Sequence, residues 1–318
     1  MRIAVLAGFD EALVDALGAQ LKGIAGVELV ELSIGATPCE ATAPLVDVVL
    51  DRASHENAFF RAWVHQAAAR GVRVVNPPQR TGPGCGFADL VRAQRAGFRT
   101  AQTVLLPAKA YAAHIGASAL RNLAFPLDWQ GLLDGLGGSA VLLPAVPMTA
   151  ARGVPVEHVQ MLLAAYDQTG TTPTLLQASV HGERVRAWCV RGAQPVLQRM
   201  DAEAVPLPDN APSVAAVDCV APVAARLLEA LDLDFAAVDF CCTDGEALLL
   251  AVDAAAPEID PESMGPGFFA IVVQQLAQRL ALGANAAVPE PKKRSVKKSS
   301  GSARGATRTN ERQESQGN

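Results

Sequence analysis

Two acidic residues in the last third of the chain have the types and spacing needed to hold a divalent cation. Asp239 lies inside an apolar run at 235–242, and Asp253 follows a second apolar run at 247–252. The Thr-Asp-Gly sequence at 243–245 is typical of a turn between two strands of one hairpin. In antiparallel strands the two carboxylates can face a common point, as a hard cation requires. The alternative is that Asp253 only ends its strand and that Asp239 accepts backbone hydrogen bonds.

The elements that must position these acids follow from the spacing of apolar residues. The first part of the chain alternates short apolar runs with helical patterns, which predicts an α/β fold with a parallel sheet. We predict strands at 2–7, 27–32, 46–50 and 72–75, with helices at 11–21 and 59–69. Later we predict helices at 89–97, 157–166, 222–234 and 267–282, paired strands at 174–180 and 184–190, and a strand at 195–198.

Composition bounds the class of protein. The chain has 318 residues, of which 50% are hydrophobic and 5% aromatic, so it can bury the core of one or two globular domains. It has no apolar run of about eighteen residues that would span a membrane. Its beginning reads as a first strand and not as a signal peptide, so we expect a cytoplasmic protein.

The six cysteines are not spaced as metal ligands. They include no C-x-x-C pair and no histidines at ligand spacing, which argues against a zinc site. Two of them, Cys241 and Cys242, are adjacent within a predicted strand. We therefore expect buried free thiols.

Charge divides the chain into an acidic body and a basic tail. Eight basic and three acidic residues follow from Pro289 onward, so the tail carries plus 5 within a chain whose net charge is minus 5. The body therefore carries minus 10, which argues against specific binding of nucleic acid. We expect the tail, rich in Ser, Gly and Lys, to be disordered.

The acidic hairpin and its surroundings resemble a known superfamily. The order of helix, Leu-Asp-Phe-Ala-x-Val-Asp at 233–239, turn, apolar strand, Val-Asp at 252–253 and then proline resembles the metal-binding end of ATP-grasp proteins. It is most similar to the glutamate ligases that modify a ribosomal protein and to glutathione synthetase. In that superfamily an Asp, a Glu and an Asn hold the magnesium ions that bridge the nucleotide phosphates. The corresponding positions here are Asp239, Ala251 and Asp253, so the resemblance implies Asp239 and Asp253 as metal ligands.

The resemblance also divides the chain. The phrase Val-Asp-Val-Val-Leu-Asp-Arg at 46–52 and the Asn-Pro-Pro at 76–78 resemble the smaller domain that precedes the ATP-grasp part. It implies a Rossmann-like domain at 1–85 and a two-lobed α+β ATP-grasp domain at 86–286. The lobes would cover about 86–170 and 171–286, and the disordered basic tail would cover 287–318.

Further site residues are implied by the same resemblance. The segment around Gln177 and Val180 resembles the hinge whose backbone holds adenine, and Arg186 matches an arginine that binds a substrate carboxylate or phosphate. Arg199 stands where the superfamily has another anion-binding arginine, although arginines on exposed strands are also common. Gly137 and Gly138 resemble the remains of a glycine loop over the nucleotide, or equally a tight turn.

Several residues that ligation needs are replaced. Where the superfamily has two phosphate-binding lysines, this chain has Phe87 in one place and Trp129-Gln130 in the other. Our first hypothesis is therefore a degenerate ATP-grasp protein that acts as a binding or partner subunit. The alternative is an active ligase that needs ATP and magnesium and joins a small-molecule or peptide carboxylate to an amine or thiol. A third reading is a small-molecule binder that uses the cleft without nucleotide.

Overall fold

The computed structural model describes residues 1–8, 10–35, 46–82, 84–116, 118–145, 153–201 and 203–282. The predicted tail at 287–318 and Cys39 lie outside these ranges. No helix in the part of the chain that the structure describes has the length and apolar character needed to cross a lipid bilayer.

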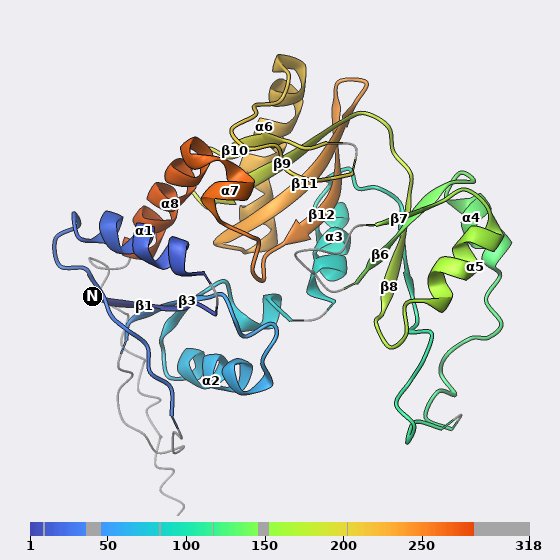
Figure 1. Ribbon diagram of the computed structural model, residues 1–318, viewed down its shortest axis with the longest axis horizontal. Coiled ribbons are helices and arrows are strands. Elements are labelled where there is room, and N and C mark those ends of the chain that lie inside the picture. Colours follow the sequence, from blue (N-terminus) through green and yellow to red (C-terminus); the bar gives the residue numbers. More distant parts are fainter. Residues whose placement is uncertain are drawn as a thin grey trace, which may run out of the picture. The chain divides into compact units, whose positions relative to one another are not determined.

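The first sheet has four parallel strands in the order β2, β1, β3, β4. Its elements are β1 (Arg2–Leu6), α1 (Glu11–Leu21), β2 (Glu28–Leu29), β3 (Val48–Asp51), α2 (Ala58–Ala69) and β4 (Arg73–Val75). Ile3 and Ala4 are both fully buried, because α1 packs on the Ile3 face and α2 on the Ala4 face (Figure 1). Burial on both faces explains why these strands are continuous apolar runs.

The second sheet is antiparallel, in the order β5, β8, β6, β7. It belongs with the elements β5 (Thr103–Leu106), α4 (Trp129–Gly135), β6 (Ala140–Pro144), β7 (Val154–Val156), α5 (Val159–Asp167) and β8 (Thr174–Ala178). Both helices cover one face, where Leu133 of α4 and Leu162 of α5 pack with Leu176 of β8. Since side chains alternate along a strand, Leu175 and Gln177 face the other way.

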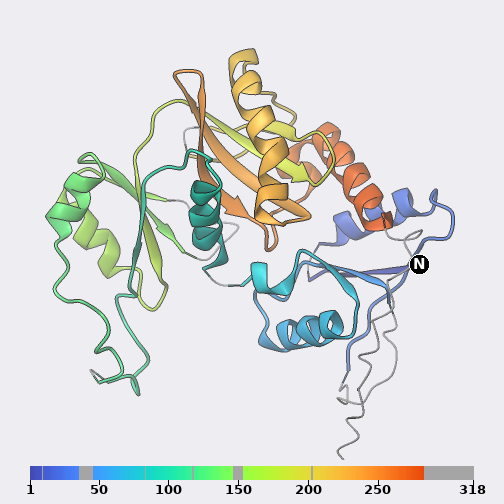
Figure 2. The ribbon, with the colours of Figure 1, turned by 180° about the vertical axis from the view of Figure 1, so that it is seen from behind.

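The third sheet is also antiparallel, in the order β10, β9, β11, β12. Its strands are β9 (Glu183–Val190), β10 (Val196–Arg199), β11 (Phe235–Thr243) and β12 (Glu246–Asp253). One face packs on α6 (Val214–Leu231) and α3 (Cys85–Arg95), which lie next to each other (Figure 2). At its Trp188 end the other face packs on α7 (Pro261–Met264) and α8 (Pro266–Ala281). A parallel sheet followed by two antiparallel ones confirms the predicted α/β class.

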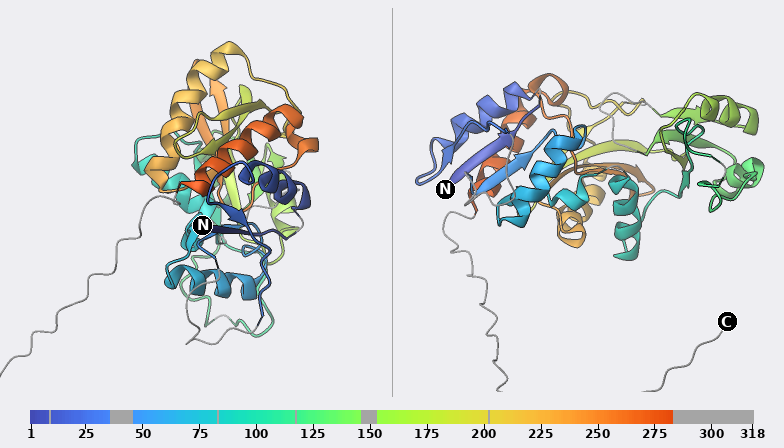
Figure 3. Two further views of the ribbon diagram at one scale, coloured as in Figure 1. Left: turned by 90° about the vertical axis from the view of Figure 1, so that its left-hand side faces the viewer. Right: turned by 90° about the horizontal axis from the view of Figure 1, so that it is seen from below.

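A single apolar cluster joins the first and third sheets. It contains Leu17 of α1, Trp188 of β9 and Val272 of α8, and α1 lies beside α8 (Figure 3). Asn76, which follows β4 and is 2% exposed, adds hydrogen bonds to this joint. Its side-chain amide donates to the carbonyl oxygens of Phe235 and Ala254, each at 2.7 Å. The predicted domain boundary at 85/86 stays a prediction, because this core includes residues from both sides of it.

The predicted acidic hairpin is confirmed. Its strands are linked by Asp244 and Gly245, which both have positive φ, 51° and 77°. Two left-handed residues form the tight turn that matches the twist of adjacent antiparallel strands, and Asp-Gly is a preferred sequence for it. This turn sets the register of β11 against β12 as far as Phe240, and a β-bulge between Asp239 and Phe240 then shifts it by one residue. The shift places Asp239 opposite Ala251 and so puts Asp253 on the same face as Asp239.

Two predicted helices need correction. The helix predicted from Asp89 begins at Cys85, and a 3-10 turn at Pro78–Arg80 precedes it. The helix predicted at 222–234 is α6, which begins after Ser213, whose hydroxyl accepts from the backbone of Ala216 at 3.2 Å. Pro222 is therefore inside the helix, where sequence rules place a start.

The strands predicted to pair at 174–180 and 184–190 do not pair with each other. β8 joins the second sheet and β9 joins the third, so the chain crosses between sheets at 179–182. Each strand finds partners from distant segments, which local sequence cannot indicate.

The prediction of free thiols is wrong for two cysteines. Cys219 of α6 and Cys242 of β11 form a disulfide, with Cα atoms 7.1 Å apart. The packing of α6 on the third sheet brings them together across 23 residues of sequence. Cys85, Cys189 and Cys241 are free, and burial raises the pKa of the Cys189 thiol to about 12.

Candidate functional site

The middle of the third sheet carries the predicted acids on one face. Asp239 of β11 lies opposite Arg186 of β9 on one side and opposite Ala251 of β12 on the other. Residues two apart in a strand share a face, so Asp253 lies diagonally across from Asp239. The sheet therefore brings together Arg186 and both predicted metal ligands, around a small Ala251 side chain.

Arg186 and Asp239 form a two-pronged ion pair. The guanidinium Nε donates to one carboxylate oxygen at 2.7 Å, and Nη2 donates to the other at 2.9 Å. Burial alone disfavours the Arg186 cation, but the charge and hydrogen bonds of Asp239 raise its pKa above the ordinary value. The guanidinium also lies 5.8 Å from the centre of the Trp188 ring. Such planar pairing fixes both side chains in one geometry.

Asp253 has different surroundings. One of its oxygens accepts a hydrogen bond from the backbone of Ala255 at 3.1 Å. Burial raises the pKa of this carboxyl, although the Ala255 N–H and the charges of Arg186 and Arg52 favour its ionised form. It forms no ion pair with any residue that the structure describes. The negative charge of Asp253 is thus only partly compensated, whereas the neighbouring Asp239 is fully paired with Arg186.

Arg52 is a charged residue near this face that sequence reasoning missed. It directly follows β3, is 5% exposed, and donates at 2.6 Å to both Asp10 Oδ2 and the carbonyl oxygen of Pro257. Its Nη1 is buried without a hydrogen-bond partner among the residues described. A signal existed, because an Arg immediately after a buried parallel strand lies where such sheets bind ligands.

The predicted hinge lies between the second and third sheets. Gln177 is 6% exposed, and its amide donates to Thr103 Oγ1 at 3.0 Å and to the carbonyl oxygen of Leu250 at 2.9 Å. Val180 packs against Cys241 and Leu250 in a small cluster. The side chain of Gln177 thus links the two sheets, and nucleotide contacts here stay a prediction.

Gly137 and Gly138 lie in the turn between α4 and β6. Their φ angles are 88° and 86°, and the backbone N–H of Gly138 donates to the carbonyl oxygen of Leu133 at 2.9 Å. This hydrogen bond ends the helix in the usual left-handed way. Trp129 and Gln130, which stand in the place of one phosphate-binding lysine in the resemblance, lie in helix α4. The role of both glycines in nucleotide binding stays a prediction.

Arg199 points away from the acidic face. Gln198 is the residue opposite Arg186 in the register, so Arg199, next in sequence, faces the α6 side. Its Nε lies 3.8 Å from a carboxylate oxygen of Glu183. The structure therefore does not bring Arg199 together with Arg186, and its catalytic role stays a prediction.

Known structures share this arrangement of sheets. The structure is similar to a RimK-domain ATP-grasp protein from Sphaerobacter thermophilus, with a TM-score of 0.62 and 18% identity over 88% of this chain and 99% of that chain. It is also similar to D-alanine–D-alanine ligase from Bacillus anthracis, with a TM-score of 0.59 and 14% identity over 89% of this chain and 97% of that one. The chain has the ATP-grasp fold.

A third similar ATP-grasp structure is the ligase PsnB with a variant of its minimal precursor, magnesium and ADP. It has a TM-score of 0.55 and 15% identity, over 87% of this chain and 98% of that chain. No protein-family model matches the chain, and no curated protein sequence matches it. The similarity therefore lies in the arrangement of the chain more than in its residues.

The side chains of this ATP-grasp fold fit a magnesium nucleotide poorly. Magnesium is usually held by one or two carboxylates together with phosphate oxygens, but Arg186 takes both oxygens of Asp239. Lys22 ends α1, and Lys109 pairs with Asp167, so neither of the two lysines that precede the tail lies at the acidic face.

Proposed function

We propose that this ATP-grasp-fold chain no longer ligates and acts as a binding or partner subunit. The Arg186–Asp239 ion pair carries the proposal. A magnesium ion at Asp239 would have to displace a guanidinium that is hydrogen-bonded to both carboxylate oxygens, at 2.7 and 2.9 Å. The second predicted ligand, Asp253, favours its proton more than an exposed carboxyl does, because burial raises its pKa. Both features weaken the attraction of the site for a cation.

Energetics support the loss of ligation. Carboxylate activation by ATP develops negative charge that a ligase must offset with metal ions and fixed cations. Removal of one such contact typically costs about 3 to 4 kcal/mol of transition-state stabilisation. This chain lacks both phosphate lysines and has alanine in place of the bridging glutamate, at Ala251. Three losses of that size leave little catalysis.

Calorimetric titration of the full chain with ATP and magnesium tests the proposal. We expect no heat beyond dilution at millimolar nucleotide, and no difference between the natural chain and Asp239→Asn. Asp244→Asn is the matched control, because it removes a carboxylate from the turn of the same hairpin and Asn tolerates the left-handed conformation found there. Magnesium-dependent binding that is lost in Asp239→Asn but kept in Asp244→Asn would refute the proposal.

A second candidate is an active ligase that uses Asp239 and Asp253 as metal ligands and arginines in place of the lysines. The shared face of the two acids favours it, because Asp253 lies diagonal to Asp239. Its substrate would be a small-molecule or peptide carboxylate. Phosphate release from ATP that disappears in Asp253→Asn would support this candidate, whereas no release with any carboxylate and amine tested would count against it.

A further inference from the structure

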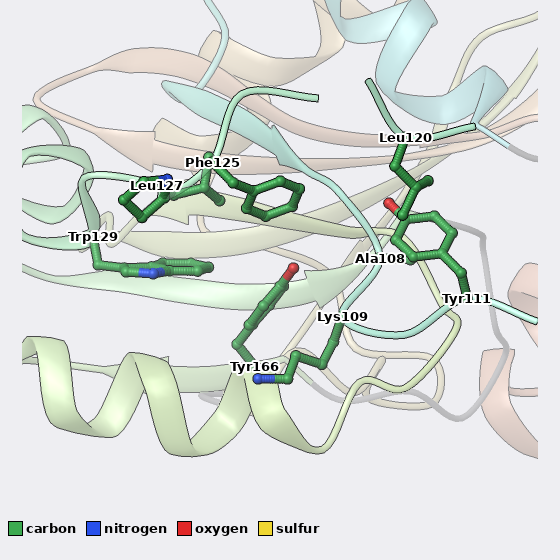
Figure 4. Close-up of a pocket in the computed structure, with 9 residues that line it drawn as sticks. Ala108, Lys109, Tyr111, Leu120, Phe125, Leu127, Trp129 and Tyr166 are labelled. Carbon is green, nitrogen blue, oxygen red and sulfur yellow. The ribbon is translucent and has the colours of Figure 1, made fainter. Parts of the chain in front are cut away.

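A cavity lies in the second sheet's part of the molecule, away from the acidic face. It has a volume of about 370 Å³ and is bounded by the segment that follows β5, by α4 and by α5. Figure 4 shows four aromatic rings around a common space, those of Tyr111, Phe125, Trp129 and Tyr166. Its volume is near the lower end of the range of small-molecule sites, and its walls are mostly apolar.

The cavity is separated from the acidic face by the second sheet. Trp129 and Tyr166 pack in the cluster that also contains Leu176, on the helix-covered face of that sheet. Gln177, the next residue in β8, points the other way and donates to Leu250 of the third sheet. A ligand of this cavity would therefore not occupy the cleft considered for nucleotide.

The aromatic side chains are arranged to receive a flat ring. Trp129 and Tyr166 have ring centres 4.7 Å apart and planes tilted by 54°, so they form a corner of the cavity. Phe125 is 56% exposed although it lines the cavity, which leaves much of its ring surface without a partner. Aromatic rings prefer offset or tilted packing on one another, as these walls would provide.

The polar side-chain groups of the cavity can all donate hydrogen bonds. The hydroxyl of Tyr166 already donates to the carbonyl oxygen of Pro107 at 2.9 Å. The hydroxyl of Tyr111 and the indole N–H of Trp129 form no hydrogen bond with any residue that the structure describes. Trp indole is a donor only. The hydroxyl of Tyr111 can donate or accept, so a ligand that carries an oxygen acceptor could use both groups.

Lys109 adds a cation at the edge of the cavity. Its Nζ lies 5.8 Å from the centre of the Tyr166 ring and pairs with Asp167. The side chains of Lys109 and Asp167 are 45% and 54% exposed, and ion pairs this exposed are weak, so Lys109 can turn to a bound anion at little cost. It is one of only two lysines before the basic tail.

We propose that this cavity binds a planar aromatic molecule that carries a carboxylate. The ring would stack between Phe125 and the corner formed by Trp129 and Tyr166. The carboxylate would accept hydrogen bonds from Tyr111 or Trp129 and pair with Lys109. This site is independent of the nucleotide cleft, so it holds whether or not the chain ligates.

Calorimetry on the full chain with three probes of the same ring system tests the proposal. The probes are indole-3-acetate, neutral indole-3-acetamide and cationic tryptamine. We expect the acetate to bind more tightly than the amide, and tryptamine to bind weakest, because the cation meets Lys109 and offers no acceptor. Lys109→Met should remove about a tenfold preference for the acetate and leave the amide unchanged. Equal binding of all three probes, or tighter binding of tryptamine, would overturn the ligand class.

Phe125→Ala is the variant of choice for the cavity itself. Its ring is exposed and belongs to no helix or strand, so the chain should keep its melting temperature while the affinity for the acetate falls about tenfold. Phe59→Ala is the matched control, because Phe59 is 53% exposed on α2 and does not line the cavity. Affinity unchanged in Phe125→Ala, or no binding of any probe at millimolar concentration, would overturn the site.

Discussion

Two polar clusters lie along the same hairpin and differ in how fully their groups are paired. At its base, the Asn76 amide donates to two backbone carbonyls, and its oxygen accepts from the N–H groups of Asp234 and Phe235 at 2.7 and 3.0 Å. At its middle, Arg186 and Asp239 satisfy each other, while Asp253 is left without an ion pair among the described residues. The polar groups of the first cluster are fully paired and join two segments of the chain. In the second cluster, the Asp253 carboxylate still lacks a charged partner.

The difference shows how to separate structural from functional polar residues in one fold. Buried polar groups that are fully paired hold elements together, and removal of one partner leaves the others unsatisfied. A carboxyl that is half-buried and incompletely paired, as Asp253 is, lowers stability when ionised, and a perturbed pKa at such a group points to another use. By this criterion Asn76 is structural and Asp253 is a candidate for function.

Substitution of Asn76 should have the largest effect on the free energy of unfolding. Asn76→Ala removes the side-chain partner of four backbone groups, three of them buried, so we expect the free energy of unfolding to fall by about 3 to 5 kcal/mol. Urea denaturation measures this loss. Asn57→Ala is the matched control, because Asn57 caps α2 by accepting from Phe59 and Phe60, and its loss should cost about 1 kcal/mol. Equal losses of stability in the two variants would show that Asn76 contributes no more than an ordinary helix cap.

The Arg186–Asp239 ion pair should make an intermediate contribution to stability. A double-mutant cycle with Arg186→Met and Asp239→Leu should yield a coupling energy of about 1 to 3 kcal/mol, because the two side chains are only 23% and 19% exposed. The same cycle on the exposed pair Lys109–Asp167 should yield less than about 1 kcal/mol. If the two coupling energies are equal, Arg186 and Asp239 are no more strongly paired than an ordinary surface pair.

Asp253 should give the smallest effect, with a size that depends on pH. Burial raises the pKa of Asp253 in the folded chain, so the folded state holds this proton more tightly than the unfolded chain does. The carboxyl therefore destabilises the fold at neutral pH, and this cost disappears as pH falls below the raised pKa towards the ordinary value. We expect Asp253→Asn to raise the melting temperature by a few degrees at most at neutral pH, with a smaller gain in acid.

Glu183 provides the opposite case on the same sheet. Burial works against its ionised form, but hydrogen bonds from the hydroxyl and N–H of Ser213 lower its pKa overall. Its stabilising contribution is present above the ordinary pKa of a glutamate and is lost as pH falls through the lowered value. Glu183→Gln should therefore reduce the melting temperature at neutral pH. Changes of the same sign in both variants would contradict our account of Asp253.

Local patterns predicted much of the fold. Helix α1 has the predicted bounds, because its leucines recur at the helical period and are all buried. The hairpin was predictable from its Asp-Gly turn, but the shared face of Asp239 and Asp253 also depends on a β-bulge beside Asp239 that the sequence did not indicate. The pairing partners of β8 and β9 were not predictable, since both strands pair with segments distant in sequence.

The candidate site was predictable only in part. Sequence resemblance indicated Asp239, Asp253 and Arg186, and the sheet brings these three together. It did not indicate that Arg186 would occupy both oxygens of Asp239, or that Arg52 would lie buried at the end of a strand of another sheet. Arg199, indicated in the same way, faces the opposite side of the sheet.

The sequence by itself determined the class of fold, the hairpin with its two acids and the absence of lysines from the body outside Lys22 and Lys109. These follow from composition and from periodicities that act over a few residues. Only the tertiary structure decided that Asp239 is paired with an arginine, that Cys219 meets Cys242, and that four aromatic rings surround one cavity. Each of these contacts joins residues far apart in the chain, and their distances depend on how helices and sheets pack.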